Sequence, residues 1–164
     1  MLWIVSHRFD PLAKKIADRH YNRQKPESPQ FVPPGRCFVL RQKRAVWVTS
    51  WPFAQYVRHA WPGAWVNSCF RRQGGRQLAS EMIRDAVSAT RWNWPDTPVI
   101  GIITFVDKSK VKAKEHVGRC YLEAGFKHIG FTKGGLWAFQ MEPCDMPPPE
   151  CPIGATEKLC MAGD

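Results

Sequence analysis

Short apolar runs with strand-like periodicity recur along the chain. Runs rich in β-branched and aromatic residues, bounded by turn-forming residues, predict single strands at 2–8, 37–42, 45–51, 65–70 and 99–106, and a closing hairpin of 126–132 with 136–141. The run at 99–106 is almost continuously apolar, which is typical of a strand buried on both faces. The pattern therefore predicts a sheet whose centre is covered on both sides.

Helix-like periodicity appears in three places, two of them marked by clear end signals. Asp10 followed by Pro11 is a typical helix start, and the apolar stripe of this helix continues as far as His20. The segment 114–124 is expected to form a short helix that ends at Gly125.

The third and longest helix is expected at about 76–91, with Ser80 on its polar face. The element order predicts an α/β (α+β) fold, in which a central mixed, mostly antiparallel sheet is flanked by helices. Residues 1–142 are predicted to form one domain. Residues 143–164, which include three consecutive prolines, are predicted to be a flexible tail.

Length and composition fit one soluble globular domain. The 164 residues are 44% hydrophobic and 23% charged, which excludes a wholly disordered chain. No apolar run approaches the roughly 20 residues that a membrane-spanning helix needs. The six cysteines form no C-x-x-C pair, so neither a disulfide framework nor a structural zinc site is expected. A cytoplasmic location is expected.

The charge is strongly basic and unevenly distributed. Lysine and arginine total 24 against 14 acids, a net charge of +10. The segment after Glu142 holds one base and four acids, so residues 1–142 carry 23 bases and 10 acids, or +13. Such a surplus favours a polyanionic partner, above all double-stranded DNA, although a basic protein without such a partner is the alternative. Eight tryptophans are compatible with base stacking or with a large core.

A glycine-bearing turn is the first candidate binding site. Arg71, Arg72, Gly74 and Gly75 lie between a predicted strand and the long helix. Backbone N–H groups, the helix dipole and the arginines would suit a pyrophosphate or a DNA phosphate. The alternative is an ordinary strand-to-helix turn with solvated charges.

The second half of the chain resembles the GNAT superfamily of N-acyltransferases. The residues that carry this resemblance are Gly118-x-x-Tyr121-x-x-Ala124-Gly125-Phe126-x-x-x-Gly130. In that superfamily a tyrosine often lies there, near the leaving thiolate, and the element order over 2–142 is also similar. The turn at 71–75 departs from the superfamily's usual pyrophosphate loop.

Five further motifs are similar to those of the Mom family of phage proteins, over most of residues 10–142. They are Asp18-Arg19-His20-Tyr21, Asn67-Ser68-Cys69-Phe70-Arg71, Leu78-Ala79-Ser80-Glu81, Thr104-Phe105-Val106-Asp107 and Gly118-Arg119-Cys120-Tyr121. Mom proteins have a GNAT-like fold and convert adenine in phage DNA to an N6-carbamoylmethyl (acetamido) form. The modification protects the DNA from host restriction enzymes.

This resemblance implies a set of active-site residues. They are His20, Tyr21, Arg71, Ser80, Asp107 and Tyr121. An iron ion is associated with the family, and His20, Tyr21 and Asp107 offer a plausible ligand set. Asp107 would help to deprotonate the adenine amine, and Tyr121 or Ser80 would protonate or orient the leaving group of acetyl-CoA or another acyl or aminoacyl donor.

Each candidate also has a purely structural interpretation. His20 is compatible with a hydrogen-bonded core residue, Asp107 with a strand exit, Tyr121 with core packing and Ser80 with a solvated helix face.

Three functions therefore stay open. The first is a DNA-modifying enzyme that grips DNA with the loops at 26–35 and 51–65. The second is an acetyl-CoA-dependent N-acetyltransferase of a small amine or a protein. The third is a basic DNA-binding module without catalysis. The oligomeric state, monomer or homodimer, is also open.

Overall fold

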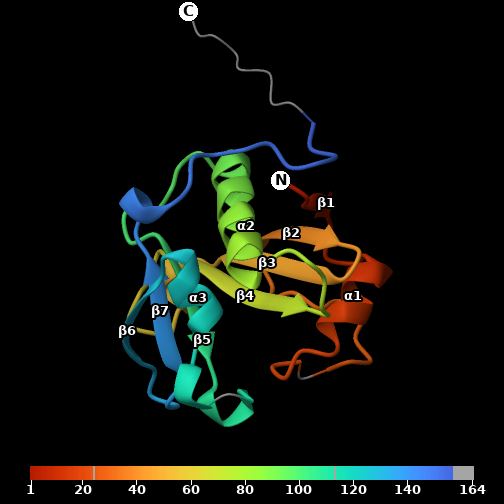
Figure 1. Ribbon diagram of the computed structural model, residues 1–164. Helices are drawn as coiled ribbons and strands as arrows, with labels where there is room; N and C mark the ends of the chain where they lie inside the picture. The colour runs from red at the N-terminus through yellow and green to blue at the C-terminus, as the bar shows by residue number, and fades with distance from the viewer. Residues whose placement is uncertain (24, 113, 157–164) are drawn as a thin grey trace, which may run out of the picture.

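The computed structural model describes residues 1–23, 25–112 and 114–156, and these form a single twisted sheet with helices on both faces (Figure 1). The strands lie in the order β1-β2-β3-β4-β5-β7-β6, and only β4 and β5 are parallel. The prediction of a mixed, mostly antiparallel sheet flanked by helices is therefore confirmed. The strands are β1 (Ile4–Ser6), β2 (Arg36–Gln42), β3 (Ala45–Trp51), β4 (Trp65–Arg72), β5 (Ile102–Val106), β6 (Lys127–Phe131) and β7 (Trp137–Met141).

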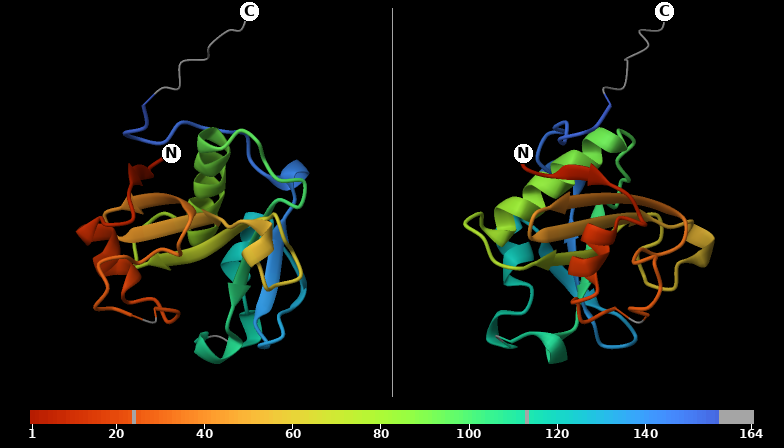
Figure 2. Two further views of the ribbon diagram at one scale, coloured as in Figure 1. Left: turned by 180° about the vertical axis from the view of Figure 1, so that it is seen from behind. Right: turned by 90° about the vertical axis from the view of Figure 1, so that its right-hand side faces the viewer.

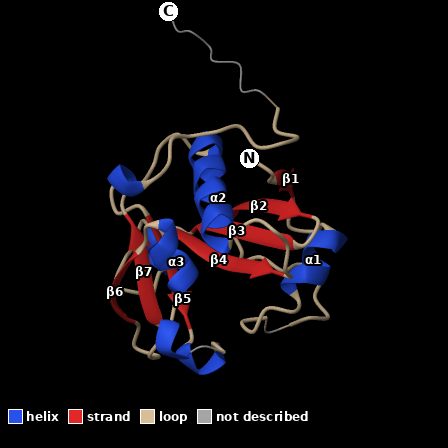
Figure 3. Ribbon diagram, viewed as in Figure 1, coloured by secondary structure: helices blue, strands red, loops and turns tan. Residues whose placement is uncertain are grey.

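The helices comprise three α-helices and four short 3-10 turns in the described part of the chain, shown in blue in Figure 3. They are α1 (Pro11–Ala17), α2 (Ala79–Asn93), α3 (Arg119–Ala124), η1 (Ala54–Tyr56), η2 (Lys108–Lys110), η3 (Lys114–His116) and η4 (Pro143–Asp145). No described helix has the length and apolar character needed to cross a membrane.

Local sequence signals explain several of these boundaries. The Asp10 carboxylate accepts hydrogen bonds from the backbone N–H groups of Leu12 (2.8 Å) and Ala13 (3.3 Å), so it is the N-cap that the sequence predicted. At the far end of α3, Gly125 has a φ of 104°, a left-handed conformation that favours glycine. Both predicted ends are confirmed.

Two hydrophobic clusters lie on opposite faces of the sheet. On one face, α2 and α3 pack on a cluster that includes three fully buried tryptophans, Trp3, Trp47 and Trp65. On the other face, α1 packs on a smaller cluster of valines from β2 and β3 together with Cys69. These three tryptophans therefore belong to the core rather than to a binding surface.

The parallel strands β4 and β5 separate after a short paired stretch. They pair only at Trp65 with Ile102, Val66 with Ile103 and Asn67 with Thr104, and β4 then continues to Arg72. The register of β4 against β3 also shifts here, so that Ser68 is left out of the pairing. Figure 1 shows the result, with β2 to β4 running across the view and β5 and β7 running down it.

Two predictions about α2 are wrong. The helix begins at Ala79 rather than near residue 76, and the side chain of Ser80 is buried, only 9% exposed, rather than solvated. The expected polar face of α2 is also covered near the C-terminal end of the helix. The segment 143–156 lies against it, and Ser88 on the expected polar face donates a hydrogen bond to the Pro148 carbonyl.

The segment 143–156 is packed, which contradicts the predicted flexible tail. Arg91 on α2 donates to the carbonyls of Met146 (3.4 Å) and Pro147 (2.8 Å). Ile153 exchanges backbone hydrogen bonds of 2.9 Å with Trp3 and Val5, so the segment ends beside β1 (Figure 2). Proline lacks an N–H donor but keeps its carbonyl acceptor, and this composition therefore does not prevent docking. Residues 157–164 of the predicted tail lie outside the described residues.

Smaller differences concern β5 and the cysteines. The strand begins at Ile102, and Val99 in the preceding turn is 97% exposed. The five cysteines among the described residues, at 37, 69, 120, 144 and 151, are free thiols, as expected.

Candidate active site

The separation of β4 and β5 opens a cavity of about 280 Å³, named here the splay cavity. Its walls come from β4, β5, the start of α3 and the residues that follow α1. Four of the five motifs quoted above for the Mom resemblance contribute residues to it, whereas the motif Leu78–Glu81 contributes none. Its lining includes His20, Tyr21, Asn67, Phe105 and Tyr121.

Asn67 is the polar centre of this cavity. Its Oδ1 accepts hydrogen bonds from the Tyr121 hydroxyl (2.8 Å) and the Thr104 hydroxyl (3.2 Å). Its Nδ2 donates to the carbonyls of Val48 (3.1 Å) and Cys69 (2.9 Å). All four contacts fix the orientation of one amide inside the sheet. Asn67 was not predicted from the sequence to be a functional residue. Its presence in the motif Asn67–Arg71 was the only signal in the sequence that pointed to it.

Tyr121 combines a packing role with a polar one. Its ring contacts Phe70, Phe126 and Phe139, and burial raises the pKa of its hydroxyl well above the ordinary value. The hydroxyl is therefore neutral at physiological pH and donates to Asn67. Both interpretations of this residue are thus compatible with its geometry.

The residues after α1 form a strap across the mouth of the splay. The strap consists of His20, Tyr21 and Asn22. The Asn22 Nδ2 donates to the Ser68 carbonyl on β4 (3.0 Å), and the Tyr21 hydroxyl accepts from the backbone N–H of Asp107 at the end of β5 (3.3 Å). The strap therefore joins the two strands on either side of the splay.

The His20 imidazole contacts Asn22 twice within the strap. Because Asn22 uses its Nδ2 on Ser68, its Oδ1 faces the imidazole, and the His20 Nδ1 lies 2.5 Å from it. The same Nδ1 accepts from the backbone N–H of Asn22 at 3.3 Å, so the two contacts hold the ring in place but call for opposite protonation of Nδ1. Burial, with a smaller effect of Arg71, lowers the pKa of His20, so the ring is neutral at pH 7. His20 is half-buried beside the cavity rather than part of either hydrophobic core.

Asp107 sits at the edge of the site with its carboxylate engaged elsewhere. Its Oδ1 accepts from the Ser109 N–H (2.9 Å) and hydroxyl (2.7 Å), which caps η2. These hydrogen bonds lower the pKa of Asp107, which weakens it as a base. Asp107 and Lys110 line a neighbouring cavity of about 430 Å³, which shares Tyr21, Asn22, Asn67, Ser68 and Phe105 with the splay cavity.

The predicted iron ligands do not form a set that suits the ion. His20 lines the splay cavity and Asp107 the neighbouring one, and the Asp107 carboxylate is held by Ser109. Burial raises the pKa of Tyr21, which opposes the phenolate form that a metal prefers. Among the described His, Cys, Asp and Glu side chains, the one cluster with metal-ligand spacing is the exposed group Glu142, Cys144 and Asp145, and Asp145 also pairs with Lys127. We derive no step through iron.

The glycine turn does not lie at a helix N-terminus as expected. Arg72, Gly74 and Gly75 line a separate cavity of about 280 Å³, and Arg72 donates to the Gly75 carbonyl (2.7 Å). The true N-terminus of α2 is capped by the Glu81 carboxylate, which accepts from the Leu78 N–H (3.1 Å). An anion is therefore not favoured at that helix end.

Arg71 and Ser80, the other two implied residues, differ in position. Arg71 is close enough to His20 to lower its pKa, whereas the described residues that line the splay cavity do not include Ser80. The Nε–H groups of Arg71 and of its neighbour Arg72 are buried, and no described atom accepts from them. The end of β4 therefore carries two arginines whose Nε–H groups are enclosed by protein.

A larger cavity, of about 800 Å³, lies on the face of the sheet opposite α2 and is named here the outer cavity. It is lined by residues of the 52–60 loop, by Pro33 and Pro34, and by the tip of the β6–β7 hairpin. Ser68 and Phe105 line both the outer and the splay cavities. The two spaces therefore meet where β4 and β5 part.

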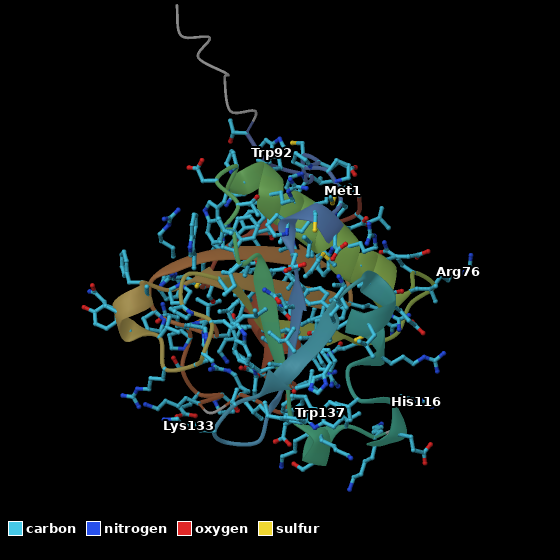
Figure 4. The ribbon with its side chains drawn as sticks, turned by 90° about the vertical axis from the view of Figure 1, so that its left-hand side faces the viewer. Met1, Arg76, Trp92, His116, Lys133 and Trp137 are labelled. Atoms are coloured by element: carbon cyan, nitrogen blue, oxygen red, sulfur yellow. The ribbon has the colours of Figure 1, made fainter. Side chains whose placement is uncertain are left out.

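Aromatic and basic side chains surround the outer cavity. The rings of His59 and Phe105 lie 5.3 Å apart, and Arg58 and Lys133 are exposed at its margin. Figure 4 shows Lys133 at the lower edge of the molecule, on the opposite side of this edge from His116. The loops at 26–35 and 51–65 were predicted to bind DNA, but neither Phe105 nor His59 was predicted from the sequence to be a functional residue.

No protein-family model, curated protein or solved structure matches this chain. The function must therefore be inferred from the geometry described above together with the motifs in the sequence.

Proposed function

We propose that this protein is a GNAT-type transferase that modifies the N6 amine of adenine in double-stranded DNA, with a carbamoylmethyl group as the product substituent. The observation that carries the proposal is that the splay cavity, which opens between β4 and β5, and the outer cavity share Ser68 and Phe105 in their linings. A group-transfer enzyme needs such an arrangement, because a donor and an acceptor must reach one point from different sides.

The splay cavity is the proposed donor side. Its position between two diverging parallel strands, followed by Tyr121 on the next helix, supports the resemblance to acyltransferases. The positive charge of Arg71, which is close enough to His20 to lower its pKa, suits an anionic group on the donor. The carbamoylmethyl product requires a donor whose methylene carbon bears both a carboxamide and a leaving group.

The outer cavity is the proposed acceptor side. Its volume falls within the roughly 300–1,000 Å³ of small-molecule sites, and a nucleobase that leaves the duplex would fit between its aromatic walls. The N6 amine of adenine is inaccessible to such chemistry inside the duplex, so extrusion is required. The net charge of +10 supports binding to the phosphate backbone.

The geometry favours His20 over Asp107 as the general base. The neutral imidazole keeps one ring nitrogen with a lone pair, whereas hydrogen bonds from Ser109 stabilise the Asp107 carboxylate. In the proposed step a bond forms from N6 to the methylene carbon of a donor that bears a carboxamide and a leaving group, and the bond from that methylene carbon to the leaving group breaks. The N6 proton passes to His20, and the leaving group departs as an anion beside the Tyr121 hydroxyl.

A nucleoside digest of DNA from cells that express the chain tests this proposal by mass spectrometry. We expect a new adenosine in which a carbamoylmethyl group replaces one hydrogen. His20→Gln should reduce its yield by about 100-fold or more, the usual contribution of a general base, whereas Asp107→Asn should reduce it by less than tenfold. Cellular DNA should also become resistant to restriction enzymes.

Other outcomes separate the alternatives. An acetyl group on adenine would indicate direct transfer from an acetyl donor, because such a transfer gives an amide. Unmodified DNA from well-folded protein would refute the proposal. The alternative, an N-acetyltransferase of a small amine or a protein, would then predict acetyl-CoA binding that is independent of DNA.

A further inference from the structure

We infer that Phe53 and Tyr56 form a wedge that enters the DNA base stack and replaces the adenine when it is extruded. This inference rests on the DNA substrate proposed above. It concerns how the duplex is opened, and it assigns a role to two residues that the chemistry at the splay does not use.

Exposure is the first observation. Tyr56 is 73% exposed and Phe53 is 62% exposed, more than any other described Phe, Tyr or Trp side chain. Adjacent exposed rings are unusual on a monomer surface and commonly mark an interaction site. Both rings belong to the 52–60 loop, at either end of η1 (Ala54–Tyr56).

The two rings form one unit. Their centroids lie 6.4 Å apart at an interplanar angle of 74°, an edge-to-face contact. The Tyr56 N–H also donates to the Phe53 carbonyl (3.0 Å), which closes the turn between them. A paired, locally braced set of rings loses less entropy on insertion than two independent side chains.

The unit is placed beside the proposed base pocket. Tyr56 itself lines the outer cavity, and so do the residues that follow it as far as Ala60. The loop is then anchored on β5, because the rings of His59 and Trp61 lie 5.3 Å and 6.0 Å from that of Phe105. An aromatic pair at the mouth of the cavity is positioned to fill the gap that an extruded base leaves behind.

Charge identifies the partner as a nucleic acid. Arg58 follows the wedge directly, and Lys133 lies across the outer cavity from the loop; both are exposed. Phosphate contacts of this kind position a protein on a duplex, while apolar wedges between base steps unstack and kink it. The aromatic wedge, with the basic side chains of Arg58 and Lys133 on either side of the cavity, matches that combination.

Plasmid topology provides a test that does not require the target sequence. Closed circular DNA is relaxed by a topoisomerase in the presence of the purified full chain, and the linking number is read after the protein is removed. A wedge unwinds the duplex, so wild-type protein should shift the topoisomer distribution. The double variant Phe53→Ala/Tyr56→Ala should abolish the shift while its affinity for single-stranded DNA stays within about threefold.

Phe9→Ala is the matched control, because Phe9 is 57% exposed but lies in the turn between β1 and α1. It should shift the topoisomers as wild type does, and circular dichroism should show all variants folded. A wild-type protein that binds DNA without a shift, or a double variant that keeps the full shift, would overturn the wedge and leave the proposed function intact. A wild-type protein that does not bind DNA would overturn both.

Discussion

Removal of the Asn67 amide should destabilise the protein more than any other single polar change near the splay. In Asn67→Ala the Tyr121 hydroxyl and the carbonyls of Val48 and Cys69 lose their partners. The Thr104 hydroxyl keeps a second acceptor, the backbone carbonyl of residue 67, at 3.5 Å. The substitution therefore removes three buried hydrogen bonds and leaves the Tyr121 hydroxyl without its acceptor.

The size of the effect follows from the cost of such groups. Each lost hydrogen bond costs about 1 kcal/mol, so Asn67→Ala should lower the free energy of unfolding by about 3 kcal/mol. Tyr121→Phe removes one hydrogen bond and leaves Asn67 with Thr104, which should cost about 1 kcal/mol. In the double variant the stranded hydroxyl is absent, so the two effects should fall short of additivity by about 1 kcal/mol.

Urea unfolding followed by tryptophan fluorescence measures these values, since the chain contains eight tryptophans. Gln55→Ala, at an exposed position in η1, is the control for loss of an amide and should change stability by less than about 0.5 kcal/mol. A cost below about 1 kcal/mol for Asn67→Ala, or full additivity with Tyr121→Phe, would refute the assignment of this network.

Three further predictions follow from other contacts. Burial lowers the pKa of His20, so the unfolded chain binds the proton more tightly, and the free energy of unfolding should fall as the pH drops below about 6.5. His20→Gln should reduce this loss of stability, which urea unfolding midpoints at pH 7.5 and 5.5 would measure. Met146→Ala should cost about 2 kcal/mol because Met146 is buried against α2, whereas Ile153→Ala, half exposed, should cost less than about 1 kcal/mol; equal effects in thermal unfolding would argue against a docked segment. Gly118→Ala should lower the melting temperature strongly, because a Cβ there would lie 2.3 Å from the Phe139 ring at a φ of +68°, whereas Gly134→Ala meets only a van der Waals neighbour and should melt close to wild type.

Local sequence signals determined much of the secondary structure. The Asp10 cap, the β2–β3 hairpin and the end of α3 at Gly125 each depend on residues within a few positions of one another. Strand and helix periodicities likewise reflect which face of an element is buried, and this produced the correct fold class. His20, Tyr21 and Tyr121 were selected from the sequence and do meet around one cavity.

Tertiary structure alone decided the rest. Asn67 became the centre of the site because β3, β5 and α3 bring three of its four partners to one amide, and no spacing along the chain encodes that meeting. Ser80 is buried on the expected polar face of α2, and the segment 143–156 covers Ser88 and Arg91 on the same helix. The periodicity of a single helix does not register such contacts with distant parts of the chain. Hydrophobic periodicity indicates which face of one helix or strand is buried and which is exposed to solvent. The separation of β4 from β5, and the two cavities that meet there, depend instead on how distant elements pack together.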